Sequence, residues 1–210
     1  MGSFGNLIER EDKISWLGCF DHRIQLVTNI ACKQAVMKKV RELISAVNHS
    51  TQAQDALLMY QKVEQPNEVA VGLIQECTTR WWTTYSTVER MLRLKRHIER
   101  AIDEKILHSS YKLTLSHWAE LEEMMQLLKP FQVVQQLLEG ESYVTASFLP
   151  AAVKHLREQL LQVSEDDDNN SVAVQELAEK MLKKLDEEFT PRSDEPGEYF
   201  RLNSTRSCLN

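Results

Sequence analysis

Apolar residues recur every three or four positions along most of the chain, and this spacing places them on one face of an α-helix. The first run covers residues 21 to about 48 and predicts one long amphipathic helix. A looser run over residues 56–63 ends at the breaker pair Pro-Asn, residues 66–67. A third run, over residues 88–102, predicts another helix.

The next predicted helix is long. Ser116 is its expected N-cap, because a serine hydroxyl can accept a hydrogen bond from the first helical turn. The apolar residues of this helix run from 118 to 131. Pro130 should kink or split it, because proline lacks the backbone N–H of an α-helix and clashes with the preceding turn. Gly140 should end it.

Two further helices and a tail complete the pattern. Ser147 is the expected N-cap of a helix whose apolar face covers residues 149–163. The acidic sequence EDDDNN at 165–170 predicts a solvated loop, and residues 174–189 predict a last helix. Residues 190–210 show no periodicity, so we expect a disordered tail there.

No segment alternates apolar and polar residues over the length of a strand. The predicted fold class is therefore all-α, a multi-helix bundle. The composition agrees, because 42% hydrophobic and 27% charged residues with few glycines are typical of a helical globular protein. The net charge of −6 means that nucleic-acid binding would have to depend on a local basic patch. No apolar run has membrane-spanning length, so we expect no membrane partner.

Cys19 and His22 have the Cys-x-x-His spacing, and Cys32 is the next thiol along the chain. Zinc bound by these three residues is one interpretation. A structural zinc site needs four ligands, however, and no second Cys or His pair follows. The spacing favours a packed thiol and a hydrogen-bonded imidazole one helical turn apart. We expect no metal, no other cofactor and no small-molecule substrate, because neither a catalytic triad nor a glycine-rich phosphate loop is recognisable.

Basic residues share one face of the helix predicted over residues 88–102, at positions i, i+3, i+4 and i+7. These residues are Arg93, Arg96, His97 and Arg100. Together with Arg80 they suit contacts with DNA phosphates, since arginine neutralises phosphate charge. The alternative, in which Glu89 and Glu99 pair with these arginines on a solvated helix face, stays open.

Two adjacent tryptophans, Trp81 and Trp82, follow Arg80 in the stretch CTTRWWTTY. A nucleobase stacks on an aromatic side chain for roughly 1–3 kcal/mol, so an exposed tryptophan beside arginine suits extruded or single-stranded nucleic acid. Tryptophan is also a common core residue. Neighbours on a helix point about 100° apart, so one ring can be buried while the other is exposed. The sequence does not decide which.

Three segments resemble, in the same order, those of hAT (hobo–Activator) transposases and their domesticated relatives with BED-type zinc fingers. CFDHRIQLV, from Cys19, is similar to the segment C-x-x-H-x-L-x-L. CTTRWWTTYSTVERMLRLK, from Cys77, resembles T-R-W-N-S-T-Y-x-M-L-E-R-L-L. LKPFQVVQQLLEGESYVTASFLPAAVKHLREQL, from Leu128, resembles the segment in which L-x-P-F precedes a T-x-S-x-x-x-P turn into a helix.

The resemblance implies that the chain corresponds to the helical insertion of an RNase H-like core, with only a remnant of that α/β core. It implies residues 1–22 as the core remnant, 23–189 as the insertion domain and 190–210 as the tail. Cys19 and His22 would then be a supporting pair near the family's active site. Trp81 would stack a flipped base, with Arg80 beside it, and Trp82 would occupy a position that is usually polar.

The family's three metal-binding acids are not recognisable in this sequence. Asp12 lacks the D-N-A-x-N context of the second acid, and no L-D-P-R-F-K segment follows the last helix. Phosphoryl transfer with two metal ions depends on such acids. We therefore expect a catalytically inactive, nuclear, transposase-derived chain that contacts DNA weakly through Arg80, Trp81 and the arginines of the basic helix face. The alternative is a helical module that binds protein partners or full-length relatives and has no nucleic-acid role.

Overall fold

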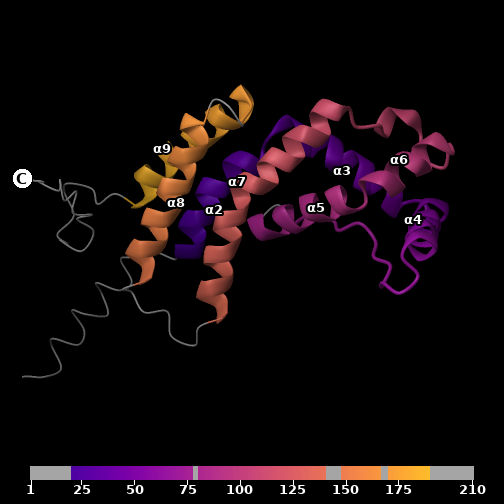
Figure 1. Ribbon diagram of the computed structural model, residues 1–210, viewed down its shortest axis with the longest axis horizontal. Coiled ribbons are helices and arrows are strands. Elements are labelled where there is room, and N and C mark those ends of the chain that lie inside the picture. The colour runs from indigo at the N-terminus through magenta and orange to yellow at the C-terminus, as the bar shows by residue number, and fades with distance from the viewer. Residues whose placement is uncertain (1–19, 78–79, 141–147, 167–169, 190–210) are drawn as a thin grey trace, which may run out of the picture.

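The computed structural model describes residues 20–77, 80–140, 148–166 and 170–189. All regular elements within these ranges are helices, which confirms the all-α prediction (Figure 1). They are α2 (Phe20–Cys32), α3 (Ala35–Asn48), α4 (Thr51–Glu64), α5 (Trp81–Arg93), α6 (Lys95–Asp103), the short 3₁₀ helix η1 (Ser109–Tyr111), α7 (Leu115–Gly140), α8 (Phe148–Glu165) and α9 (Val172–Phe189).

The helices form an elongated bundle around α7 (Figure 1). At one end, α8 packs along α9, and both α9 and α7 pack against α2. In the middle, α5 lies against α7. At the other end, α4 packs against α6 and α3. The segment between α4 and α5 has no regular structure and leads the chain to the first turn of α5.

The first predicted helix is wrong in one respect, because residues 20–48 form two helices, α2 and α3. The break lies at Lys33 and Gln34, and Gln34 has extended backbone angles (φ −60°, ψ 149°). The reason is the phase of the apolar residues. At 100° per residue, the buried residues of α2 and those of α3 would lie on nearly opposite sides of one continuous helix. The break turns both faces to the same core.

The third predicted helix is also two helices, α5 and α6, separated at Leu94 (φ −96°, ψ 7°). This break does not rotate the buried face, because Met91, Leu94 and Ile98 are all buried. It does divide the predicted basic face. Arg93 ends α5, whereas the other basic residues lie on α6.

The long helix α7 begins one residue before its predicted N-cap. Thr114, not Ser116, is the cap: its hydroxyl accepts from the backbone N–H of His117 at 3.2 Å, and the His117 ring accepts from the N–H of Thr114 at 3.1 Å. Pro130 does not split the helix, which continues through it as one element. The helix ends at Gly140, as predicted. Only one backbone hydrogen bond is lost at a proline, and packing on both sides can hold the helix together.

The other boundaries agree with the sequence pattern. Ser50 caps α4 by accepting from the N–H of Ala53, and α4 ends before the predicted Pro-Asn breaker. Ser171 caps α9 by accepting from the N–H of Val174. The predicted N-cap Ser147, residues 167–169 of the acidic loop and the predicted disordered tail, residues 190–210, lie outside the described residues.

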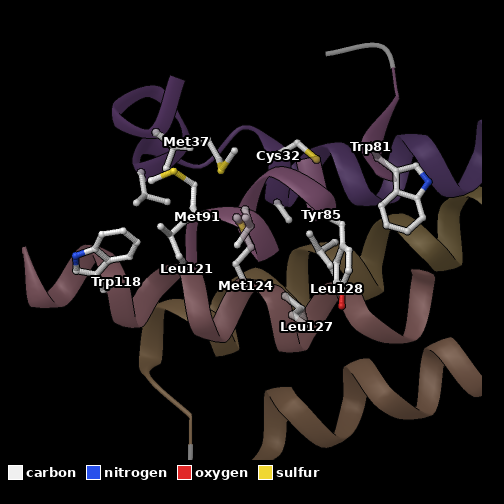
Figure 2. Packing of buried hydrophobic residues seen from close by; sticks show 14 of the residues in the cluster. Cys32, Met37, Trp81, Tyr85, Met91, Trp118, Leu121, Met124, Leu127 and Leu128 are labelled. Carbon is white, nitrogen blue, oxygen red and sulfur yellow. The ribbon is translucent and has the colours of Figure 1, made fainter. Parts of the chain in front are cut away.

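A single continuous cluster of buried side chains forms the core. Figure 2 shows Trp81 and Trp118 at opposite ends of a row of these side chains, with Met91, Leu121 and Met124 between them. Both indoles are 1% exposed. The cluster takes side chains from every α-helix from α2 to α9.

Candidate nucleic-acid interface

Side chains of α4 and α5 hold the segment that precedes α5. The Gln61 amide donates to the carbonyl of Val71 and accepts from its N–H, at 2.9 and 3.0 Å. Arg90 donates to the carbonyl of Gly72 at 2.8 Å, and Thr87 donates to the carbonyl of Ile74 at 3.3 Å. These side-chain bonds take the place of the backbone hydrogen bonds of a helix or strand, and they fix the path of the chain toward the Arg-Trp motif. Residues 78 and 79, directly before Arg80, are not described.

A buried polar cluster joins this segment to three helices. The Glu76 carboxylate accepts from the guanidinium of Arg41 on α3 and from the hydroxyl of Thr84 on α5, the latter at 3.1 Å. Arg41 also donates to the carbonyl of Cys32, the last residue of α2, at 2.9 Å. The Glu76 side chain is 2% exposed, so these partners satisfy a charge that would otherwise be costly to bury. The cluster ties the first turn of α5 to the corner between α2 and α3.

Burial raises the pKa of the Cys32 thiol, and the negative charge of Glu76 adds to this increase. The hydrogen bond with Thr84 and the positive charge of Arg41 oppose it without cancelling it. A raised pKa leaves less thiolate at a given pH, and the thiolate is the reactive form. We predict that iodoacetamide at pH 8 labels the exposed Cys77 much faster than Cys32 in the folded protein. Peptide mapping by mass spectrometry measures this, and equal labelling rates would contradict it.

Trp81 lies in the core. Its indole N–H donates to the side-chain carbonyl of Gln135 on α7 at 2.9 Å, and its ring meets the edge of Phe131 with centroids 6.4 Å apart. At 1% exposure, neither face of the ring is accessible to a base in this arrangement. The residue that the family resemblance assigns to base stacking therefore has a packing role in this structure.

Trp82 is the accessible ring of the pair. It is half-buried and packs partly against the core. The guanidinium carbon of the exposed Arg80 lies 5.7 Å from its ring centroid, within the range of a cation–π contact. The structure thus brings the side chains of Arg80 and Trp82 together at the surface. The side chain of Trp81, between them in sequence, points into the core.

Two arginines of the basic face on α5 and α6 are paired with acids, although among the described residues not with the predicted Glu89 and Glu99. Arg93 pairs with Glu68 at 3.0 Å, and Arg100 pairs with Glu104 at 2.8 Å. Hydrogen bonds from Tyr60 and Arg100 lower the pKa of Glu104, so its carboxylate stays charged. Arg96 is exposed and has no ion pair within the described ranges.

His97, predicted on this face, is buried next to Glu64, with 3.5 Å between ring nitrogen and carboxylate, and it lines a cavity of about 160 Å³. The predicted interface is also not continuous. Arg80 and Arg93 lie at opposite ends of α5, about 20 Å apart at 1.5 Å per residue. The basic face and the Arg-Trp motif are therefore two separate surfaces.

The Cys-x-x-His pair can be placed only in part, because Cys19 lies outside the described residues. His22 is exposed on α2, and Cys32 is buried at the end of the same helix. They are about 15 Å apart along the helix axis, so they cannot share a metal ion. Among the described residues there is also no group of three or more potential metal ligands.

Sequence reasoning missed the buried cluster of Arg41, Glu76 and Thr84. One signal was available: Glu76 is a single acid that follows the apolar stretch VAVGLIQ directly before the Arg-Trp motif. A charged residue in such a context is expected to need a partner. The identity of that partner, Arg41, depends on tertiary packing.

The described residues form an all-helical bundle with the Arg-Trp motif at the start of α5. A sequence model of the family described as the ZBED1 RNase-like helical domain matches residues 17–127, just over half of the chain. The chain therefore belongs to this family, which confirms the resemblance to hAT-derived, BED-type proteins. The matched region contains the Arg-Trp motif, the buried cluster and helices α2 to α6.

The human protein "Zinc finger BED domain-containing protein 4" is 23% identical to this chain over 185 residues. The match covers 83% of the chain and 15% of that protein, so the chain spans about one seventh of the length of its relative. No solved structure matches the chain. None of the described helices is long and apolar enough to span a membrane.

Proposed function

We propose that this helical domain contacts single-stranded or hairpin DNA through Arg80 and Trp82, in the nucleus and without a catalytic step of its own. The observation that carries the proposal is the half-exposed Trp82 ring with the guanidinium of Arg80 beside it. A base can stack on the ring while the guanidinium neutralises the adjoining phosphate. The proposal keeps Arg80 from the predicted site and assigns base stacking to Trp82 in place of the buried Trp81.

Two features support this assignment. Arg80 is the N-cap residue of α5, so it lies at the positive end of the helix dipole, where an anion is favoured. The relationship to a protein named for a BED zinc finger supports a nucleic-acid role and a nuclear location. One stacked base contributes roughly 1–3 kcal/mol, so this contact alone would be weak and would serve as part of a larger interface.

The proposed domain comprises residues 23–189, with residues 1–22 as the approach from the core of the longer fold. The helix α2 begins at Phe20 and crosses this boundary. Arg23 donates to the backbone carbonyl of Glu188 at 2.6 Å, and Phe20 packs on Phe189 with ring centroids 5.3 Å apart. The contact between Arg23 and Glu188 joins the two ends of the proposed domain and supports its treatment as one unit, whereas the contact between Phe20 and Phe189 links the approach segment to it.

The salt dependence of binding tests the proposal. We expect binding to a labelled single-stranded oligonucleotide to weaken steeply between about 50 and 200 mM NaCl, because each neutralised phosphate contributes about −0.7 to the log–log slope. The Arg80→Gln variant should reduce the steepness of that slope by about 0.7. Fluorescence anisotropy measures both. Absence of binding at 50 mM salt, or a slope that Arg80→Gln leaves unchanged, would refute the role of Arg80.

A second candidate function is protein binding by an exposed apolar face of α7. Val133 and Leu137 lie one helical turn apart and are 43% and 51% exposed. An apolar interface on this face would depend little on salt and would show a negative heat-capacity change on binding. Calorimetry with a candidate protein partner therefore separates this function from DNA contact.

A further inference from the structure

The segment between α4 and α5 presents its backbone polar groups in an alternating pattern. The N–H and the carbonyl of Val71 both bond the side-chain amide of Gln61 on α4. The carbonyls of Gly72 and Ile74 both accept from side chains of α5. In an extended chain, the N–H and C=O of one residue point to the same side, and successive residues point to opposite sides. The bonds at residues 71, 72 and 74 follow this alternation, so the segment runs as an extended chain.

Leu73 and Gln75 fall on the side of the segment that faces away from α5. Neither residue forms a backbone hydrogen bond within the described part of the chain. Gln75 is exposed and Leu73 is half-buried. An extended segment with unpaired N–H and C=O groups is a template for pairing with another strand.

A groove of about 850 Å³ adjoins Gln75. It is lined by Arg41, Ser45 and His49, which follow one another at successive turns of α3, and by Tyr111 of η1. Pockets that bind ligands have volumes of about 300–1,000 Å³. The groove therefore has room for a short peptide strand beside the unpaired backbone groups of Gln75.

The charge and hydrogen-bonding groups of this groove suit a peptide better than a nucleic acid. Arg41 is bound to the buried carboxylate of Glu76. Glu42, which also lines the groove, is exposed and forms no ion pair within the described ranges, and the charge of Lys38, one turn before it, offsets its own. The groove thus has no excess of positive charge for phosphates. Donors and acceptors that repeat every two residues, about 7 Å, match a peptide backbone, whereas a DNA backbone has no donor for the free carbonyls.

We infer that an extended peptide segment of a partner protein binds in this groove by strand addition, with backbone hydrogen bonds to Leu73 and Gln75. This site goes beyond the proposed DNA contact. Glu76, next to Gln75, bonds Thr84, which is about 160° around α5 from Trp82. The groove and the Trp82 ring therefore lie on different sides of α5, and either can be occupied without the other.

NMR of the isotope-labelled protein with the hexapeptide Ac-Thr-Val-Lys-Val-Thr-Val-NH2 tests the inference. The β-branched residues of this probe favour an extended chain. We expect the amide signals of Leu73 and Gln75 to shift, and their hydrogen exchange to slow roughly tenfold at about ten times the Kd of the peptide. The amides of Val71 and Cys77 already donate to side chains of the protein, so their exchange should change much less.

Two N-methylated forms of the hexapeptide provide a matched control. Methyl groups on the second and fourth residues block one edge of the strand and leave the other free, so this form should bind like the parent peptide. Methyl groups on the third and fourth residues interrupt both edges. This form should bind at least about tenfold more weakly, because it loses a backbone hydrogen bond and introduces a clash whichever edge it presents. Equal binding by the two forms would overturn the inference.

The variants Gln75→Ala and Gln75→Pro separate the backbone of the protein from its side chain. Alanine keeps the N–H of residue 75 and should leave peptide binding unchanged, whereas proline removes this donor and should abolish binding. Circular dichroism checks that both variants are folded. Equal loss in both would assign binding to the side chain and overturn backbone pairing.

Three further outcomes would overturn the inference. The first is the absence of any shift at Leu73 with the parent peptide. The second is a shift at Leu73 that a single-stranded oligonucleotide produces and the peptide does not. The third is protection of Leu73 and Gln75 that rises with protein concentration alone, which would make a second copy of the chain the occupant of the groove.

Discussion

Replacing Trp81 by alanine is expected to lower the free energy of unfolding by about 3–5 kcal/mol, the usual cost of truncating a fully buried tryptophan. The indole is 1% exposed and contacts the edge of Phe131. Its N–H donates to the side chain of Gln135, which is itself 8% exposed. The substitution therefore leaves a cavity and also removes the hydrogen bond that the indole donates to Gln135.

Urea denaturation followed by circular dichroism measures this loss. Trp82→Ala is the matched control, because it removes the same side chain from the adjacent position. It should cost about 1 kcal/mol, since half-burial means that less apolar surface is lost. If Trp81→Ala were no more destabilising than Trp82→Ala, Trp81 would not be the core residue of the pair. The assignment of base stacking to Trp82 would then have no basis.

Helix phase determined where the sequence prediction of the fold succeeded and where it failed. The apolar spacing locates α4, α7 and α9 because each has one continuous buried face. The break between α2 and α3 was also readable in principle, since the apolar residues on either side of Gln34 are out of phase. The break at Leu94 gives no such signal, because the buried face continues through it. It could not be predicted from periodicity.

The candidate site was predictable only as a motif. The sequence identifies Arg80 and two adjacent tryptophans. Because neighbours on a helix point about 100° apart, the two rings must point in different directions. Which ring is buried depends on Gln135 and Phe131, which are distant in sequence and reach Trp81 only because α5 packs on α7. Likewise, charge spacing identifies the basic face, but Glu68 and Glu104, which neutralise it, lie outside that helix pattern.

The Trp82→Ala variant is expected to bind single-stranded DNA about 5- to 150-fold more weakly than the parent at about 50 mM salt. This range corresponds to the loss of one stacked base, roughly 1–3 kcal/mol. Trp82→Phe should recover part of the affinity, because phenylalanine still offers an aromatic face. The salt slope should stay unchanged in both variants, since neither removes a phosphate contact. Fluorescence anisotropy with a labelled oligonucleotide gives the affinity and the slope.

The comparison with Trp81→Phe decides which tryptophan contacts the base. That variant keeps an aromatic ring in the core but cannot donate to Gln135. It should therefore be less stable than the parent and, at temperatures where it remains folded, should bind DNA with unchanged affinity. If Trp81→Phe weakened binding while Trp82→Ala did not, the buried indole would have to leave the core on binding. The faces of the Trp81 ring become accessible only when the packing of α5 on α7 is lost. In that event, DNA contact would be controlled by the opening of α5 away from α7 and not by the exposed Trp82 ring.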